Sequence, residues 1–211
     1  MRSKEAVKSP LRELIGGPWM LLFMVLLSGI GLVVALLQRR KRRENPPETV
    51  AEVDLAKYSG TWYEISRIPS WFERDCAGST SHYSLRDDGK LDVRNHCFVG
   101  TLDGPEREVH GLAWMPDPEQ PAKLKVRIFP WPWAGDYWIV QLGPKYKYAV
   151  VSNIDRTRLW ILSRTPSMEA HLYQEIIARL ELAGFNTERL VDTLQALGEE
   201  DDDSSPVDGT L

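Results

Sequence analysis

Cys76 and Cys97 are the residues of this 211-residue sequence whose positions suggest the most specific chemistry. They flank the turn signal Asp87-Asp88-Gly89 at similar distances along the chain. Pairing of the strands on either side of that turn would bring the two sulfur atoms together. A disulfide here would close a loop of about 20 residues and stabilise the fold by roughly 3 kcal/mol. Because disulfides persist outside the cytosol, the pair favours an exported domain.

The remaining reactive residue types indicate no metal, cofactor or nucleic acid. The histidines, His82, His96, His110 and His171, show no zinc-type spacing with the cysteines. The sequence contains no phosphate-binding loop, dinucleotide fingerprint or nucleophile elbow. The formal net charge is -4, so the chain as a whole lacks the basic character of a nucleic-acid-binding protein. The sequence therefore predicts neither a metal nor a cofactor.

The elements that would position these residues are short strands separated by turn signals, a pattern typical of an all-β sandwich or barrel. Turns are indicated by residues 87–89 and 116–121 and by Gly143-Pro144. An eight-stranded up-and-down antiparallel β-barrel closes all its edges and leaves an interior for one small ligand, so we favour it over a sandwich. The predicted strands are 60–68, 80–85, 90–98, 106–114, 122–129, 136–142, 146–152 and 158–164.

Two other segments have apolar patterns typical of helices. From Met168 to Ala183, apolar residues recur at helical spacing, which predicts a C-terminal α-helix packed outside the barrel. Residues 18–37 carry no charge and could span a hydrocarbon core of about 30 Å, which predicts one N-terminal transmembrane helix rather than a cleaved signal peptide. The predicted organisation is an N-terminal flank (1–17), the transmembrane helix (18–37), a basic and proline-containing linker (38–53), the barrel domain (54–198) and an acidic tail (199–211).

Three segments, in order, resemble the sequence motifs of the lipocalin family. Gly60-Thr61-Trp62 resembles the first motif, on the first strand, and Gly135-Asp136-Tyr137-Trp138 resembles the second, before the sixth strand. Residues 160–166 resemble the third, whose arginine ends the eighth strand. Within the family, the chain is similar to the bacterial outer-membrane lipocalin group, which is itself similar to apolipoprotein D. The resemblance covers residues 54–194 and implies a barrel that holds a small apolar molecule.

The resemblance also implies roles for individual residues. Gly60, Trp62 and Arg164 would be structural, with the tryptophan at the closed end of the barrel and the arginine across its ring. Five residues match positions that line the ligand cavity in the family, namely Tyr83, Asn95, Ile128, Tyr137 and Trp160. Their alternative role is ordinary packing within the barrel.

Aromatic side chains are concentrated in the loops after the first and fifth strands, at Trp71, Phe72, Trp131 and Trp133. In an up-and-down barrel both loops lie at one end, which in the lipocalins is the open mouth. Such rings favour a membrane interface, so we expect the mouth to face a bilayer. A hydrophobic lid or a dimer contact is the alternative.

The function that the resemblance implies is a membrane-anchored, non-enzymatic lipid carrier. It would bind and store or transport a fatty acid or lysophospholipid for membrane maintenance, and its partners would be the lipid and the membrane, with a homodimer as an option. One alternative is a cavity enzyme that uses a free Cys97 or Glu64, although Glu64 is expected to be a structural group near the barrel floor. The other alternative is a protein-interaction module that uses the aromatic mouth.

Two signals disagree about the side of the membrane. The cations at residues 39–43 lean towards a cytoplasmic barrel by the positive-inside rule. The cysteine pair and the exported lipocalins favour the opposite side. We expect a single-pass protein of a bacterial inner membrane with a periplasmic barrel, and the alternatives are an outer-membrane location and a cytoplasmic barrel.

Overall fold

The computed structural model describes residues 18–70 and 73–196. The chain divides into two compact units, Met1–Asn45 and Pro46–Leu211. The predicted N-terminal flank (1–17), the acidic tail (199–211) and the two aromatic residues Trp71 and Phe72 lie outside the described residues.

The first unit contains helix α2, Pro18–Glu44. Near its middle, the Ser28 hydroxyl donates to the carbonyl oxygens of Met24 (2.8 Å) and Val25 (3.0 Å). Within the part of the chain that the structure describes, no helix has the length and apolar character needed to cross a membrane. The transmembrane helix predicted for residues 18–37, and the inner-membrane anchoring that depended on it, are therefore not supported.

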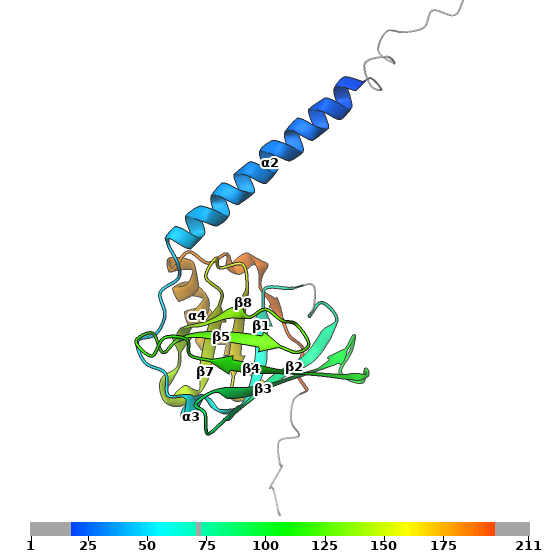
Figure 1. Cartoon of the computed structure of the whole chain (residues 1–211). Coiled ribbons are helices and arrows are strands. Elements are labelled where there is room, and N and C mark those ends of the chain that lie inside the picture. The colour runs from blue at the N-terminus through cyan, green and yellow to red at the C-terminus, as the bar shows by residue number, and fades with distance from the viewer. Residues whose placement is uncertain (1–17, 71–72, 197–211) are drawn as a thin grey trace, which may run out of the picture. The chain divides into compact units, whose positions relative to one another are not determined.

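The second unit contains a closed antiparallel β-barrel (Figure 1). Neighbouring strands pair in sequence order, and β1 closes the ring because it pairs with β8 on one side and β2 on the other. The predicted eight-stranded barrel is confirmed. Its strands are β1 (Gly60–Arg67), β2 (Cys76–Leu85), β3 (Leu91–Val99), β4 (Glu106–Trp114), β5 (Lys123–Ile128), β6 (Gly135–Leu142), β7 (Tyr148–Ser152) and β8 (Leu159–Ser163).

The barrel interior is apolar because alternate side chains on each strand point inward. Its buried members come from all eight strands and from the segment before β1, so one contiguous cluster fills the interior. They are Val53, Tyr58, Trp62, Tyr83, Leu91, Val93, Ala113, Ala122, Leu124, Tyr137, Ile139, Ala149, Val151 and Leu162.

A single helical turn, α3 (Leu55–Tyr58), precedes β1. Asp54 caps it, since its side chain accepts hydrogen bonds from the backbone N–H groups of Ala56 and Lys57. The turn places Tyr58, which is fully buried, in the interior cluster. A second short turn, η1 (Pro144–Tyr146), joins β6 to β7, and the Tyr146 hydroxyl accepts a hydrogen bond from the Asp54 backbone N–H at 2.8 Å.

Helix α4, Ala170–Leu182, packs on the outside of the barrel (Figure 1). Its Ile176 and Leu180 side chains are fully buried in a second apolar cluster with Val150 and Ile161, which point outward from β7 and β8. The predicted C-terminal helix is confirmed, because the apolar stripe read from the sequence is the face that it buries.

The chain after α4 returns to the barrel through η2 (Thr187–Arg189) and the short strand β9 (Val191–Asp192), which pairs with β1. The β1–β2 ladder stops at Tyr63 and Thr80. Beyond that point the C-terminal segment bridges the two strands: Gly78 N–H donates to the Leu194 carbonyl (2.7 Å), and Gln195 Nε2 donates to the carbonyls of Glu64 and Ser79 (2.8 Å each).

Candidate functional site

One end of the barrel is closed by Trp62 and Arg164. The guanidinium carbon of Arg164 lies 3.8 Å from the Trp62 ring centroid, and the indole Nε1 donates to the Tyr58 carbonyl at 2.8 Å. The same guanidinium donates to five backbone carbonyls, and its partial burial lowers its pKa. The acceptors are Lys57 (2.8 Å), Tyr58 (3.1 Å), Ser59 (3.0 Å), Thr61 (2.8 Å) and Tyr146 (3.3 Å).

Gly60 has a positive φ of 96°, a conformation that favours glycine. A Cβ atom there would lie 3.3 Å from Arg164 Nη1. The structure therefore brings Gly60, Trp62 and Arg164 together at the closed end.

Above this floor, three tyrosine hydroxyl groups meet inside the barrel. Tyr137 Oη lies 2.8 Å from Tyr58 Oη and 2.8 Å from Tyr83 Oη. All three rings are buried, and burial raises the pKa of all three, with the pKa of Tyr58 and Tyr137 held well above the usual range. The hydroxyls therefore stay protonated and act as hydrogen-bond donors as well as acceptors.

Towards the other end, four apolar or amide side chains that face inward are only half-buried. The strand register places Asn95 opposite Val109, with Ile128 facing the same interior one step further round the barrel. These three residues and Trp160 of β8 are of intermediate exposure, whereas Val93 and Leu91, deeper on β3, are buried. The barrel is thus packed at its closed half and accessible at its open half.

Two observations describe the rim and the unused polarity of the open half. Gly135, opposite the inward-facing Val126, is exposed, and a Cβ atom on it would meet no atom within 4 Å. The Asn95 side-chain oxygen is buried but has no hydrogen-bond partner among the residues that the structure describes. A buried acceptor without a donor is costly, so this oxygen is suited to a ligand group that donates a hydrogen bond.

A buried ion pair lies in the barrel wall where the C-terminal segment is inserted. Arg67 Nη1 donates to the Glu64 carboxylate, and both side chains are over 90% buried. The Thr193 hydroxyl donates to the same carboxylate at 2.5 Å. The prediction of Glu64 as a structural group near the floor is thus wrong in its location, because its partners lie at the open half and in the C-terminal segment.

Glu73, in the loop between β1 and β2, adds a second carboxylate near this pair. Ser70 Oγ donates to its Oε2 at 2.6 Å, and the Trp160 side chain also interacts with it. Burial raises the pKa of Glu73, and the negative charge of Glu64 adds to the effect. Trp160 is therefore placed between the apolar interior and a carboxyl group at the rim.

Cys76 and Cys97 form a disulfide at this same end, with their Cα atoms 5.4 Å apart. Arg107 Nη2 lies 2.7 Å from Cys76 Sγ and 3.6 Å from Cys97 Sγ. The alternative of a Cys97 nucleophile is wrong, because this sulfur is bonded to Cys76 and offers no thiolate.

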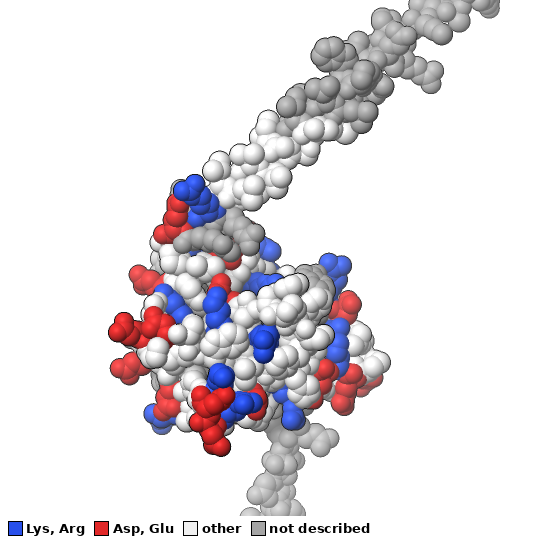
Figure 2. All heavy atoms as spheres, viewed as in Figure 1, with Lys and Arg blue, Asp and Glu red and all other residues white. Residues whose placement is uncertain are grey.

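The β5–β6 loop carries exposed aromatic residues. Trp131 is 49% exposed, Trp133 is 71% exposed, and their ring centroids are 6.4 Å apart. Phe129 is exposed as well, with the Arg127 guanidinium 5.1 Å from its ring. In Figure 2 the middle of the visible barrel face is mainly uncharged with a few Lys and Arg, and the acidic side chains lie along its margins.

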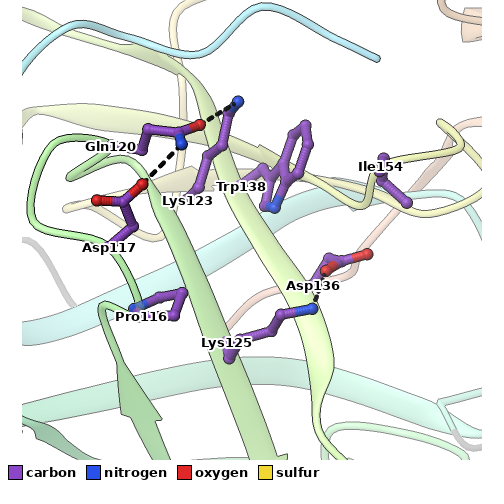
Figure 3. Close-up of a pocket in the computed structure, with 8 residues that line it drawn as sticks. All are labelled: Pro116, Asp117, Gln120, Lys123, Lys125, Asp136, Trp138 and Ile154. Atoms are coloured by element: carbon purple, nitrogen blue, oxygen red, sulfur yellow. Dashed lines mark hydrogen bonds and ion pairs between the residues drawn. The ribbon is translucent and has the colours of Figure 1, made fainter. Parts of the chain in front are cut away.

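A shallow hollow of about 220 Å³ lies on the outer face of β5 and β6 (Figure 3). Its charged groups are already paired: Lys125 Nζ is 2.6 Å from Asp136, and Lys123 Nζ donates to Gln120 Oε1 at 2.7 Å while lying 4.6 Å from the Trp138 ring centroid. These internal contacts leave the hollow less suited to a ligand than the barrel interior.

Residues 53–195 match the model of the lipocalin-like domain. The chain belongs to the lipocalin-like family. The resemblance read from the three sequence motifs is confirmed.

Among relatives, outer membrane lipoprotein Blc of Escherichia coli is 38% identical over 149 residues, which cover 69% of this chain and 83% of that protein. Mouse apolipoprotein D is 32% identical over 187 residues, which cover 84% and 95%. Two solved structures share the lipocalin fold at 18% identity: lobster apocrustacyanin A1 (TM-score 0.55; 72% of this chain and 91% of that chain) and insecticyanin from the tobacco hornworm (TM-score 0.57; 71% and 85%).

Sequence reasoning missed several residues of this lipocalin barrel. Tyr58 lies in a one-turn helix that is too short for a periodic signal, although the Asp54 cap is an available clue. Arg67 follows a β-bulge between Glu64 and Ser66, which shifts the parity on which inward and outward assignments depend. Thr193 reaches the barrel only through β9, a pairing that no local pattern predicts.

Proposed function

We propose that this lipocalin binds one apolar molecule with a small polar group in the open half of its barrel. A single-chain lipid, such as a fatty acid or a lysophospholipid, fits this description, and its storage or transport would serve membrane maintenance. The proposal rests chiefly on one contrast: the inward side chains are fully packed at the closed half, whereas Val109, Ile128 and Trp160 are only half-buried at the open half.

Apolar burial would supply most of the affinity. Val109 and Ile128 offer apolar surface from the neighbouring strands β4 and β5, and Trp160 offers it from β8. At about 25 cal/mol per Å², burying 200–300 Å² of ligand and wall there contributes roughly 5–8 kcal/mol before the entropic cost of binding. The unpaired oxygen of Asn95 would orient a hydroxyl or amide hydrogen of the ligand.

The exposed aromatic loop supports a second part of the proposal, namely that the open end contacts a lipid surface. Trp131 and Trp133 together expose two indole rings, and such rings partition to the membrane interface. Arg127 next to this loop adds a positive charge that suits anionic head groups. A ligand could then pass between bilayer and barrel with little exposure to water.

The test is native mass spectrometry of the full-length chain titrated with palmitic acid and with palmitoyl lysophosphatidylcholine. We expect a one-to-one complex with at least one of them. Trp160→Ala should weaken binding roughly tenfold to a hundredfold, because a large apolar contact is lost. Asn95→Leu should weaken it less.

Arg94→Ala is the matched control, because Arg94 neighbours Asn95 but points outward and its side chain is 61% exposed. The control should bind like the unmodified chain. A chain that takes up neither lipid, or three variants that bind equally, would contradict the proposed site.

A further inference from the structure

The three tyrosine hydroxyls inside the barrel have one more hydrogen-bond donor than the hydrogen bonds between them require. Each hydroxyl carries one hydrogen, and the hydrogen bonds Tyr58–Tyr137 and Tyr83–Tyr137 each require one donor hydrogen. The remaining hydrogen has no acceptor among the described residues around it. The Ser81 side chain is also hydrogen-bonded to Tyr83. It does not change the number of surplus donors, because it adds one hydroxyl hydrogen and one hydrogen bond.

This surplus donor is unusual because of where it lies. Tyr58 is fully buried, and the exposures of Tyr83 and Tyr137 are 3% and 9%. A buried donor that is left unsatisfied destabilises the folded state, so such groups in proteins normally have a partner. Burial also raises the pKa of Tyr58 and Tyr137, so neither loses its proton near neutral pH.

The cluster lies at the boundary between the packed and the accessible halves of the interior. Tyr137 is the central hydroxyl and the most exposed of the three, and it is separated by one residue from Gly135, which is exposed at the rim of the open half. Tyr83 is opposite Val93, one inward position below Asn95. A ligand in the open half would therefore meet the cluster with its leading end.

We propose that the tyrosine cluster donates a hydrogen bond to an acceptor oxygen at the leading end of the ligand. This inference rests on the proposed function and narrows its ligand class to chains that enter with a carbonyl, ether or hydroxyl oxygen first. A purely hydrocarbon leading end would leave the surplus hydrogen unsatisfied and would bind less tightly for that reason.

The experiment uses two probes of the same shape, methyl nonyl ketone and the alkene in which a CH2 group replaces the carbonyl oxygen. Each displaces the dye N-phenylnaphthylamine from the full-length chain, and infrared spectroscopy records the stretch of the bound, isotope-labelled ketone carbonyl. In the unmodified protein we expect this stretch at a lower frequency than in alkane solution, as for a hydrogen-bonded carbonyl. A frequency equal to that in alkane would overturn the inference.

Tyr→Phe variants locate the donor while keeping every ring in place. Tyr58→Phe with Tyr83→Phe leaves Tyr137 as the single hydroxyl, and adding Tyr137→Phe removes the last donor. We expect this third change to weaken ketone binding about threefold to tenfold and to leave alkene binding unaltered. Equal effects on both probes, or none on either, would overturn the inference. If neither probe displaces the dye, the proposed function itself is contradicted. If the variants do not fold, the carbonyl frequency in the unmodified protein alone tests whether the ligand accepts a hydrogen bond.

Discussion

Arg164 joins three separate segments at the closed end of the barrel. We therefore expect its loss to lower the stability of the fold. Its guanidinium contacts the ring of Trp62 and the carbonyls of α3, β1 and η1. Its position after the eighth strand could be predicted from the third motif. The backbone carbonyls that it would bind could not, because they depend on the tertiary approach of residues 57–61 and 146.

We expect Arg164→Ala to lower the free energy of unfolding by about 2–4 kcal/mol, since it removes a cation–π contact and several charge-assisted hydrogen bonds. Arg164→Lys should recover only a minor part, because an ammonium cannot reproduce the planar fork. Urea unfolding monitored by tryptophan fluorescence measures both. A loss below about 0.5 kcal/mol in Arg164→Ala would contradict this role.

Glu73 gives a residue-level prediction about pH. Its folded-state pKa is raised above the ordinary value of 4.5, chiefly by burial. The folded state therefore binds more protons than the unfolded chain between these two pKa values, and this contribution to stability is lost as the pH rises through that interval.

Glu73→Gln cannot ionise, so its stability relative to the unmodified protein should increase as the pH rises from 4 towards neutrality. Thermal unfolding at a series of pH values measures the difference between the two proteins. The exposed Glu119→Gln serves as the control and should show no such trend. A difference between Glu73→Gln and the unmodified protein that is constant with pH would show that burial of this carboxyl has no energetic effect.

At the scale of elements, the strands were predictable because their signals are local. Turn residues such as Asp87–Gly89 delimit strands whose inward and outward residues alternate, and every predicted strand overlaps an observed one. The largest boundary error is in β2, which begins at Cys76 rather than residue 80 because the register shift between Ala77 and Thr80 interrupts the alternation. The α3 turn and β9 were missed because each is stabilised by distant partners.

The β5–β6 loop provides a prediction at this scale. Replacing Trp131 and Trp133 by Ser should weaken binding of the full-length chain to anionic phospholipid vesicles in a sedimentation assay, because two exposed indole rings are lost. Leu182→Ser is the matched control, since Leu182 is 90% exposed on α4, away from the loop. Equal vesicle binding by the unmodified chain, the tryptophan variant and Leu182→Ser would contradict contact between this loop and the membrane.

At the scale of the whole molecule, the family and the barrel followed from the sequence, but the predicted anchoring did not hold. Three motifs in order were sufficient for the lipocalin-like family, and the domain match covers residues 53–195. The apolar run at residues 18–37 predicted a transmembrane helix, which the described structure does not support. The disulfide of the barrel still favours a compartment outside the reducing cytosol.

Fluorescence quenching by a brominated fatty acid tests whether the ligand lies within the barrel. Bromine quenches tryptophan on contact, and Trp160 faces the open half whereas Trp138 lies on the outer face beside Lys123. We predict quenching that saturates at one ligand per chain, that falls in Trp160→Phe and that persists in Trp138→Phe. Quenching that never saturates, or that is the same in both variants, would contradict a ligand held inside the barrel.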